Sequence, residues 1–223
     1  MKLTDDLYVY EWQNPFENNC NSFYIGGDVQ AVIDPGLSGF FPDLLVRMQA
    51  DGIEREHIRY VINTHCHPDH FEASEHFNDD ETVAVCLLDE EMNFYNEAGK
   101  DMYQMFGLRA PVITVDRILK AGSLTLGSET FEVLHVPGHS PGSLALYWPS
   151  VKALFPGDVV FYQSVGRTDF HGGSGSQLKE SIRKLSSLDV EYLLPGHMDI
   201  LTGRDAVADN FRLIINHVFP YIA

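Results

Sequence analysis

Alternating apolar and polar positions open the chain and predict that a sheet forms before any helix. Residues 7–10 are an apolar and aromatic run after a polar start, which is typical of a strand. Residues 22–25 and 30–33 predict two more strands, and the glycine-rich segment 26–28 between them suits a tight hairpin turn. The amino-terminal part of the chain is therefore expected to form a β-sheet.

The first helical pattern lies within residues 41–50. Leu44, Leu45 and Met48 recur there at helical spacing, and Gly52 ends the pattern. The apolar run 60–62 then predicts a buried strand. Together these segments predict a β-helix-β unit that carries the residues after position 62 to the edge of the sheet.

A helical insertion is expected at about residues 88–108. Met92, Tyr95, Met102 and Phe106 follow one another at helical steps, and a glycine interrupts the run, so the pattern predicts one or two helices. A stripe of methionine and aromatic residues usually packs into a core. The alternative is that this segment caps a site and lines a substrate pocket.

The second half of the chain predicts another sheet. Short strand signals separated by turn residues recur over residues 112–153. A helix is expected at 177–185 after a serine-rich loop that can cap it, then a strand at 190–194 and a closing helix at 205–218. The strands predicted for this second sheet are 118–119, 124–126, 130–136 and 143–148.

Composition and charge narrow the class of protein. The chain has 223 residues, 44% of them hydrophobic, so one large domain spanning 1–223 with a substantial core is expected. Its 32 acidic and 15 basic residues give a formal charge of −17. Such a surface repels nucleic acid and anionic membranes, so neither is expected as a partner.

Cysteine use and the absence of apolar stretches predict a soluble cytoplasmic protein. Cys20, Cys66 and Cys86 form no paired framework, which favours a reducing compartment. The amino terminus has no apolar signal-like region, and no apolar run approaches the length of a membrane span. In an extended chain the side chain of Cys66 points away from those of its histidine neighbours. We therefore expect it to pack into the interior as a small apolar side chain rather than bind a metal.

The densest chemistry of the chain lies directly after the strand at 60–62. His65, His67, Asp69 and His70 fall within six consecutive positions, and Pro68 cannot extend the strand. Period-two alternation aims the first two histidines to one side, and the turn at the proline can swing the aspartate and the last histidine toward the same point. The pattern therefore predicts a metal site.

The alternative is a polar loop that is rich in histidine by chance. Crowded imidazoles without a cation would repel one another and cost stability, whereas a divalent ion turns the crowding into attraction. Asp34 ends another buried strand, and it is interpreted either as a residue that orients a metal ligand or as an ordinary turn aspartate.

Three later predicted strands end in the same short motif, a Pro-Gly pair followed by a potential ligand. The ligands are His139, Asp158 and His197. Proline stops the strand and glycine permits a sharp bend, so the next side chain can be aimed back over the strand end. Any one of these could be a plain turn, but three beside the first cluster favour a shared site.

The candidate ligands are numerous enough for two ions. The five imidazoles and two carboxylates are more ligands than one tetrahedral ion can bind. Their number suits two divalent ions that share a bridging carboxylate. Nitrogen and oxygen ligands without thiolate suit Zn, Fe(II) or Mn, and the three stay open.

These ordered motifs resemble the metallo-β-lactamase superfamily over nearly the whole chain. The resemblance implies an α/β fold, a four-layer αββα sandwich with the metals at one edge. It implies that Asp158 bridges two ions and that Asp34 is a scaffold residue. The implied ligands are His65, His67 and His139 for one ion, and Asp69, His70 and His197 for the other.

Within that superfamily, residues 166–170 (GRTDF) are similar to a segment of glyoxalase II-like thioesterases and persulfide dioxygenases. Glyoxalase II proper has a C-terminal helical domain that helps to bind glutathione, whereas 26 residues follow His197 here. Phe71 and Glu72 also replace the small, glycine-rich continuation that is common in the family after the histidine motif.

The expected activity is metal-dependent hydrolysis of a small ester-like bond, with a thioester (hydroxyacylglutathione hydrolase-like) placed first. Asp69 is the catalytic candidate that orients the attacking water and shuttles its proton. One alternative is a mononuclear Fe(II) persulfide dioxygenase that uses His65, His139 and Asp158. A lactonase or other metallo-hydrolase, a diiron oxidoreductase and a metal-stapled binding module also stay open.

Four residues are candidates for the substrate pocket. They are Tyr95, Tyr103, Tyr162 and Arg167. The arginine either meets an anionic group of a small-molecule substrate or pairs with Asp169 and fixes its loop, and the second interpretation is favoured. A homodimer is compatible with the sequence.

Overall fold

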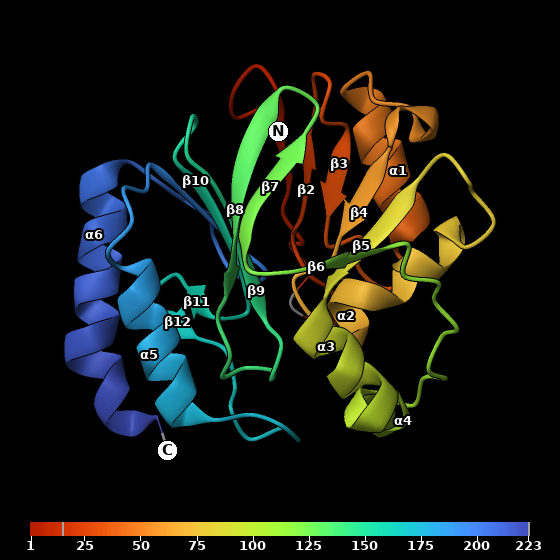
Figure 1. Cartoon of the computed structure of the whole chain (residues 1–223). Helices are drawn as coiled ribbons and strands as arrows, with labels where there is room; N and C mark the ends of the chain where they lie inside the picture. The colour runs from red at the N-terminus through yellow and green to blue at the C-terminus, as the bar shows by residue number, and fades with distance from the viewer. Residues whose placement is uncertain (15, 223) are drawn as a thin grey trace.

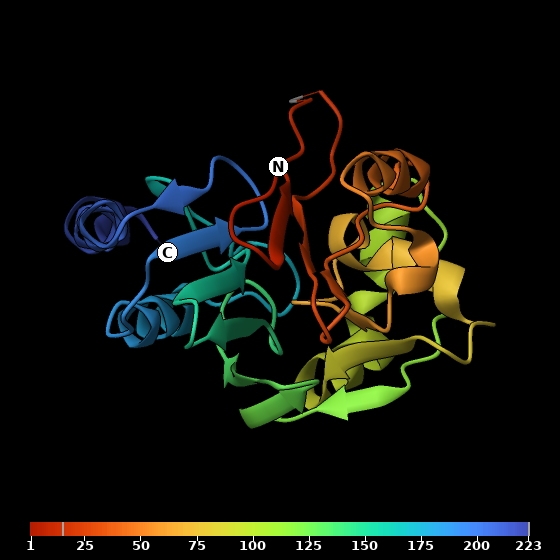
Figure 2. The same cartoon turned by 90° about the horizontal axis from the view of Figure 1, so that it is seen from above.

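A computed structural model describes residues 1–14 and 16–222 and has the expected four layers. Two six-stranded sheets pack face to face, and helices cover the outer face of each sheet (Figure 1). Seen from above, both sheets lie between the two helical layers (Figure 2). The αββα sandwich predicted from the sequence is therefore confirmed.

The first sheet combines an antiparallel hairpin with parallel strands. Its order follows the chain, from β1 to β6, and the hairpin of β2 and β3 is the one expected from the glycine-rich turn. From β3 onward neighbouring strands are parallel, so their carboxyl ends share one edge. The strands are β1 (Leu7–Tyr10), β2 (Ser22–Ile25), β3 (Ala31–Ile33), β4 (Tyr60–Ile62), β5 (Ala84–Leu88) and β6 (Arg117–Leu119).

One strand, β6, lies in the first sheet although it is predicted in the second. The sequence pattern predicts the segment 118–119 in the second sheet, but β6 pairs in parallel with β5, with Leu88 opposite Leu119. The prediction was wrong because an apolar run indicates a strand without indicating its partner, and β6 reaches its partner across the long connection from residue 106 to 116.

The second sheet has the order β14-β13-β10-β9-β8-β7. Strands β7 to β10 form an antiparallel meander, and β10 pairs in parallel with β13. As a result β8, β10 and β13 run in the same direction and end at one edge. The strands are β7 (Gly122–Leu126), β8 (Glu129–His135), β9 (Leu144–Trp148), β10 (Ala153–Gly157), β13 (Tyr192–Pro195) and β14 (Leu201–Thr202), with a small hairpin of β11 (Val160–Phe161) and β12 (Ser164–Val165).

Helices close both outer faces. On the first sheet lie α1 (Phe41–Ala50), α2 (Pro68–Phe71), α3 (Asp89–Phe94) and α4 (Asp101–Met105), with a π-helical turn at Tyr95–Gly99. On the second sheet lie α5 (Gly175–Leu185), which Ser174 caps as expected, and α6 (Arg204–Leu213). Short 3-10 or π-helical turns occupy Arg55–His57, Glu72–Phe77, Ile214–Val218 and Phe219–Tyr221.

The core holds the strand ends in fixed positions. Side chains of both sheets interdigitate between them, and the rings of Phe23 and Phe155 meet edge to face with centroids 5.3 Å apart. One further apolar layer lies between the first sheet and its helices, and another lies between the second sheet and its helices. Among the described residues, no helix combines the length and apolar character needed to cross a bilayer.

Candidate metal centre

Loops from both sheets meet at one edge of the sandwich. The loop after β4 carries His65, His67, Asp69 and His70, and Asp34 follows β3. Three loops of the second sheet supply the remaining candidates, His139 after β8, Asp158 after β10 and His197 after β13. The structure brings all seven proposed ligands together, because these strands share a direction and end at the same edge.

The motif after β4 folds as its residue types require. His67 still has an extended backbone and stands immediately before α2, whose first residue is Pro68. One helical turn then brings Asp69 and His70 back toward the same point, and all of these side chains are buried. Cys66 faces the scaffold instead, where its side chain joins an apolar cluster and its sulfur lies beside Gly99.

One group consists of three buried imidazoles. Nε2 of His139 lies 3.2 Å from Nε2 of His65 and 2.8 Å from Nδ1 of His67. The three side chains are at most 4% exposed. Three nitrogens therefore converge in a volume that water hardly reaches.

Hydrogen bonds fix the tautomers of two of these rings. Nδ1 of His139 donates to the carbonyl oxygen of Arg167 at 2.7 Å. The hydroxyl of Thr64 donates to Asp34, so its oxygen accepts from Nδ1 of His65 at 3.1 Å. Each neutral ring therefore carries its lone pair on Nε2, and the two lone pairs face each other.

A second group contains Asp69, His70 and His197. Nε2 of His197 lies 3.2 Å from Oδ2 of Asp69 and 3.3 Å from Nε2 of His70. Nδ1 of His70 donates to Oδ2 of Asp34 at 2.9 Å. In the neutral ring of His70 the lone pair is therefore on Nε2 and points into the group.

Asp158 lies between the two groups. Its Oδ2 is 3.5 Å from Nε2 of His139 and 3.3 Å from Nε2 of His197, and its Oδ1 is 3.2 Å from Nε2 of His70. Oδ1 is nevertheless a buried oxygen without a hydrogen-bond donor in the described part of the chain. An unsatisfied carboxylate oxygen among nitrogen lone pairs is a place for a cation.

The electrostatics of the centre agree with this placement. Burial, followed by the charges of neighbouring histidines, lowers the pKa of His65 and His67 well below the ordinary value, which favours their neutral, ligating form. Burial also disfavours the charged form of His197, but the adjacent Asp158 raises its pKa to about 10. The carboxylate likewise raises the pKa of His70, so without a cation this half of the centre holds protons that a divalent ion would replace.

The donor set fits divalent ions. Three groups of side chains each offer ligand atoms within 4.8 Å of one another, and the atoms are imidazole nitrogens and carboxylate oxygens. Such mixed sets suit Zn, Fe(II) or Mn. The groups are His65 with His67 and His139, His65 with His70 and Asp158, and Asp69 with His70 and His197.

The glycines of the Pro-Gly pairs are needed because the ligand loops approach one another closely. Gly157 has φ of +53°, and a Cβ there would lie 2.6 Å from Oγ1 of Thr64. At Gly196 the constraint is space alone, because a Cβ would lie 2.3 Å from Oδ1 of Asp158 and 2.5 Å from Cε1 of His70. These glycines let the strand ends carry their ligands into contact.

A mostly apolar cavity of about 350 Å³ opens beside the ligands. Sequence reasoning named Met102, Phe106 and Arg167 but missed the rest of the wall, although Met198 directly follows the proposed ligand His197. The wall residues include Met102, Phe106, Phe161, Val165, Phe170 and Met198, together with Asn18 and Arg167.

Three predicted pocket tyrosines do not line this cavity. Tyr95 and Tyr103 belong to the helical segment and are buried, and their hydroxyls donate to the carbonyl oxygens of Pro111 and Cys66. Tyr162 is 40% exposed, and its neighbour Phe161 faces the cavity instead. The sequence placed them near the site but could not give their side-chain directions.

Arg167 lines the cavity but is already paired. Its guanidinium donates to both carboxylate oxygens of Asp169, at 2.9 and 2.7 Å, and lies 4.2 Å from the ring centroid of Phe170. This is the loop-fixing role that the sequence analysis favoured.

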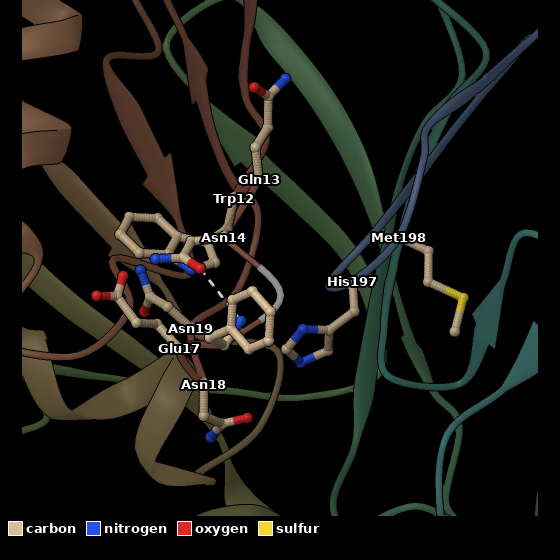
Figure 3. A pocket seen from close by; sticks show the side chains of 9 residues that line it. Trp12, Gln13, Asn14, Glu17, Asn18, Asn19, His197 and Met198 are labelled. Carbon is tan, nitrogen blue, oxygen red and sulfur yellow. Dashed lines mark hydrogen bonds between the residues drawn. The ribbon is translucent and has the colours of Figure 1, made fainter.

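A more polar hollow of about 500 Å³ adjoins the centre. It lies between the β1–β2 connection and the loop after β13, with residues of the connection on one side and His197 and Met198 on the other (Figure 3). The residues drawn and labelled around it are Trp12, Gln13, Asn14, Glu17, Asn18, Asn19, His197 and Met198.

Comparison with known proteins identifies the family. The sequence model of the metallo-beta-lactamase superfamily matches residues 15–197 of this chain. The chain belongs to this superfamily. It is accordingly a metallo-hydrolase whose fold family binds divalent metals, and its candidate centre occupies the strand ends described above.

Several relatives align over most of their length. A probable metallo-hydrolase of Methanocaldococcus jannaschii is 30% identical over 84% of this chain and 91% of the relative. Hydroxyacylglutathione hydrolase GloC of Haemophilus influenzae is 32% identical over 82% of this chain and 86% of its own. A protein solved in a di-iron-bound form superposes with a TM-score of 0.72 and 31% identity, covering 88% of this chain and 94% of that one.

Asp34 provides a test of the centre. Its backbone φ of 52° is also accessible to asparagine, so Asp34→Asn preserves the turn but removes one acceptor for Thr64 or His70. We expect zinc affinity to fall about 10- to 100-fold, measured by competition with a fluorescent chelator. Asp5→Asn, at a fully exposed carboxylate, is the matched control. Unchanged affinity in Asp34→Asn would show that the carboxylate does not orient a ligand.

Proposed function

We propose that this metallo-hydrolase cleaves thioesters, or closely related small acyl esters, whose acyl group is apolar. The observation that supports the proposal most strongly is the juxtaposition of the convergent ligand set and the apolar cavity beside it. The ligand set supplies the hydrolytic chemistry, and the cavity selects the acyl group.

In this proposal His65, His67 and His139 hold one ion, and Asp69, His70 and His197 hold the other. Asp158 serves both, because its two oxygens lie within 3.5 Å of histidines from each group. Divalent ions in such a site supply a water of lowered pKa and polarise a carbonyl group. Zn, Fe(II) and Mn all suit the ligands.

Asp69 is the proposed residue that orients the attacking water. It lines the cavity, and Oδ2 stays 3.2 Å from His197. Burial opposes its ionisation, but the hydrogen bond from His197 and the charges of His70 and His197 lower its pKa to about 2. An ionised carboxylate in the wall of the cavity can accept a hydrogen bond from water and pass on its proton.

The wall of the cavity supports an apolar acyl group. Phe106, Phe161 and Phe170 contribute aromatic surface beside the ligands. Arg167 contributes the single Lys or Arg side chain among the described lining residues, and Asp169 already neutralises it. Binding of the acyl group therefore depends on burial of apolar surface rather than on ion pairing.

The comparisons support the thioester assignment. GloC of Haemophilus influenzae is named a hydroxyacylglutathione hydrolase, and the aligned region covers 86% of it. A persulfide dioxygenase needs one Fe(II) held by His65, His139 and Asp158. That alternative leaves the convergence of Asp69, His70 and His197 without a use, so we place it second.

A substrate panel tests the proposal. Protein reconstituted separately with Zn, Fe(II) and Mn is assayed on thioesters with aliphatic, aromatic and hydroxyacyl groups, on glutathione thioesters, lactones and phosphodiesters, and for oxygen uptake with glutathione persulfide. We expect the highest kcat/KM on thioesters with apolar acyl groups. Faster hydrolysis of lactones or phosphodiesters, or oxygen uptake that exceeds thioester turnover, would contradict it.

Phe106 tests the role of the cavity wall. Phe106→Ala is expected to raise KM for an aromatic thioester about tenfold, equivalent to roughly 1.4 kcal/mol of lost binding, with little change in metal content. Met105→Ala is the matched control, because this neighbour at the end of α4 is 71% exposed and absent from the wall. Equal KM values for the two variants would show that the acyl group binds elsewhere.

A further inference from the structure

Glu91 in α3 is a buried carboxylate that the proposed reaction does not use. Its side chain is fully buried, and it accepts three hydrogen bonds of 2.8 Å. The backbone N–H of Cys66 donates to Oε1. The hydroxyl of Ser140 and the backbone N–H of Gly142 donate to Oε2.

The donors belong to two loops that carry ligands. Cys66 stands between His65 and His67 in the loop after β4, and Ser140 directly follows His139 in the loop after β8. The first loop belongs to one sheet and the second to the other. One carboxylate thus connects the two backbone segments that present the group of three imidazoles.

Close packing keeps both loops against the helical segment. A Cβ at Gly142 would lie 2.1 Å from the backbone nitrogen of Glu91, so the loop after β8 contacts the start of α3 directly. A Cβ at Gly99 would lie 3.0 Å from Sγ of Cys66, and the hydroxyl of Tyr103 donates to the carbonyl oxygen of Cys66 at 3.2 Å. Both backbone polar groups of Cys66 are therefore held by side chains of this segment.

A carboxylate is a costly choice for this interior position. Burial of a charge is unfavourable unless hydrogen bonds compensate for the lost water, and here three donors from two separate loops do so. An apolar side chain could fill the space, but it would leave two buried N–H groups without acceptors. The carboxylate is suited to fixing the loops relative to each other.

We propose that Glu91 is a positioning residue, which sets the distance between the His65–His67 pair and His139 and thereby the affinity of this group for a divalent ion. The inference rests on the metal-binding part of the proposed function and is independent of the substrate. It also gives the helical segment around α3 and α4 a role as the outer support of the ligand loops.

Glu91→Gln tests the inference with the least change in shape. The amide has one acceptor oxygen, so its NH2 group must face a backbone N–H of one loop, and that loop loses its acceptor. Glu90→Gln is the matched control, because Glu90 is the preceding residue of α3 and is exposed. Both variants change the net charge equally.

Zinc titration of the chelator-stripped proteins at low temperature is the primary measurement. We expect Glu91→Gln to bind zinc about 10- to 100-fold more weakly than Glu90→Gln, and amide exchange at Cys66 or Gly142 to be faster. Raised zinc should restore thioesterase kcat with unchanged KM. A residue that served only stability would lower the melting temperature without moving zinc affinity in the folded protein.

Zinc affinity in Glu91→Gln equal to that of the control would overturn the inference, whether or not thioesters are the substrate. If Glu91→Gln does not fold, Ser140→Ala removes one of the three bonds and leaves the carboxylate in place. Weakened zinc binding in that variant supports the inference, and unchanged binding contradicts it. Because zinc binding is measured separately from turnover, failure of the proposed thioesterase activity remains distinguishable.

Discussion

Nitrogen lone pairs face one another in a buried volume at the edge of the sandwich, and the surrounding strands and loops hold them there. Asp34 and the carbonyl oxygen of Arg167 bind the Nδ1 atoms of His70 and His139, so the Nε2 atoms of these rings must point inward. Asp158 adds an unsatisfied carboxylate oxygen between the two groups. Positive charge at the centre would relieve the repulsion among these lone pairs and satisfy the oxygen, which is why we interpret it as a site for divalent ions.

The fold brings these groups together by ending five strands at one edge. Parallel pairing within each sheet gives the ligand loops a common direction, and the apolar layer between the sheets fixes their separation. Glu91 then connects the loops from outside the centre. The cavity wall, in contrast, comes from α4 and the loops around β11 and β12, so substrate preference can vary while the metal-binding scaffold stays the same.

The sequence could predict which side chains converge because the signals for them are local. His65 to His70 crowd into one turn, and each Pro-Gly pair forces a bend immediately before its ligand, so both signals can be read without knowing long-range contacts. The partner of β6 and the directions of Tyr95 and Tyr103 depend on tertiary packing, which a local pattern does not contain. Glu91 escaped notice because it follows Asp89 and Glu90, and a run of acids at a helix start usually faces water.

Anomalous diffraction from crystals of zinc-loaded protein would show directly whether these side chains hold two ions. We expect two zinc peaks, one among His65, His67 and His139 and the other among Asp69, His70 and His197, with Asp158 beside both. A single peak, or zinc bound only outside these seven side chains in the fully loaded protein, would contradict it.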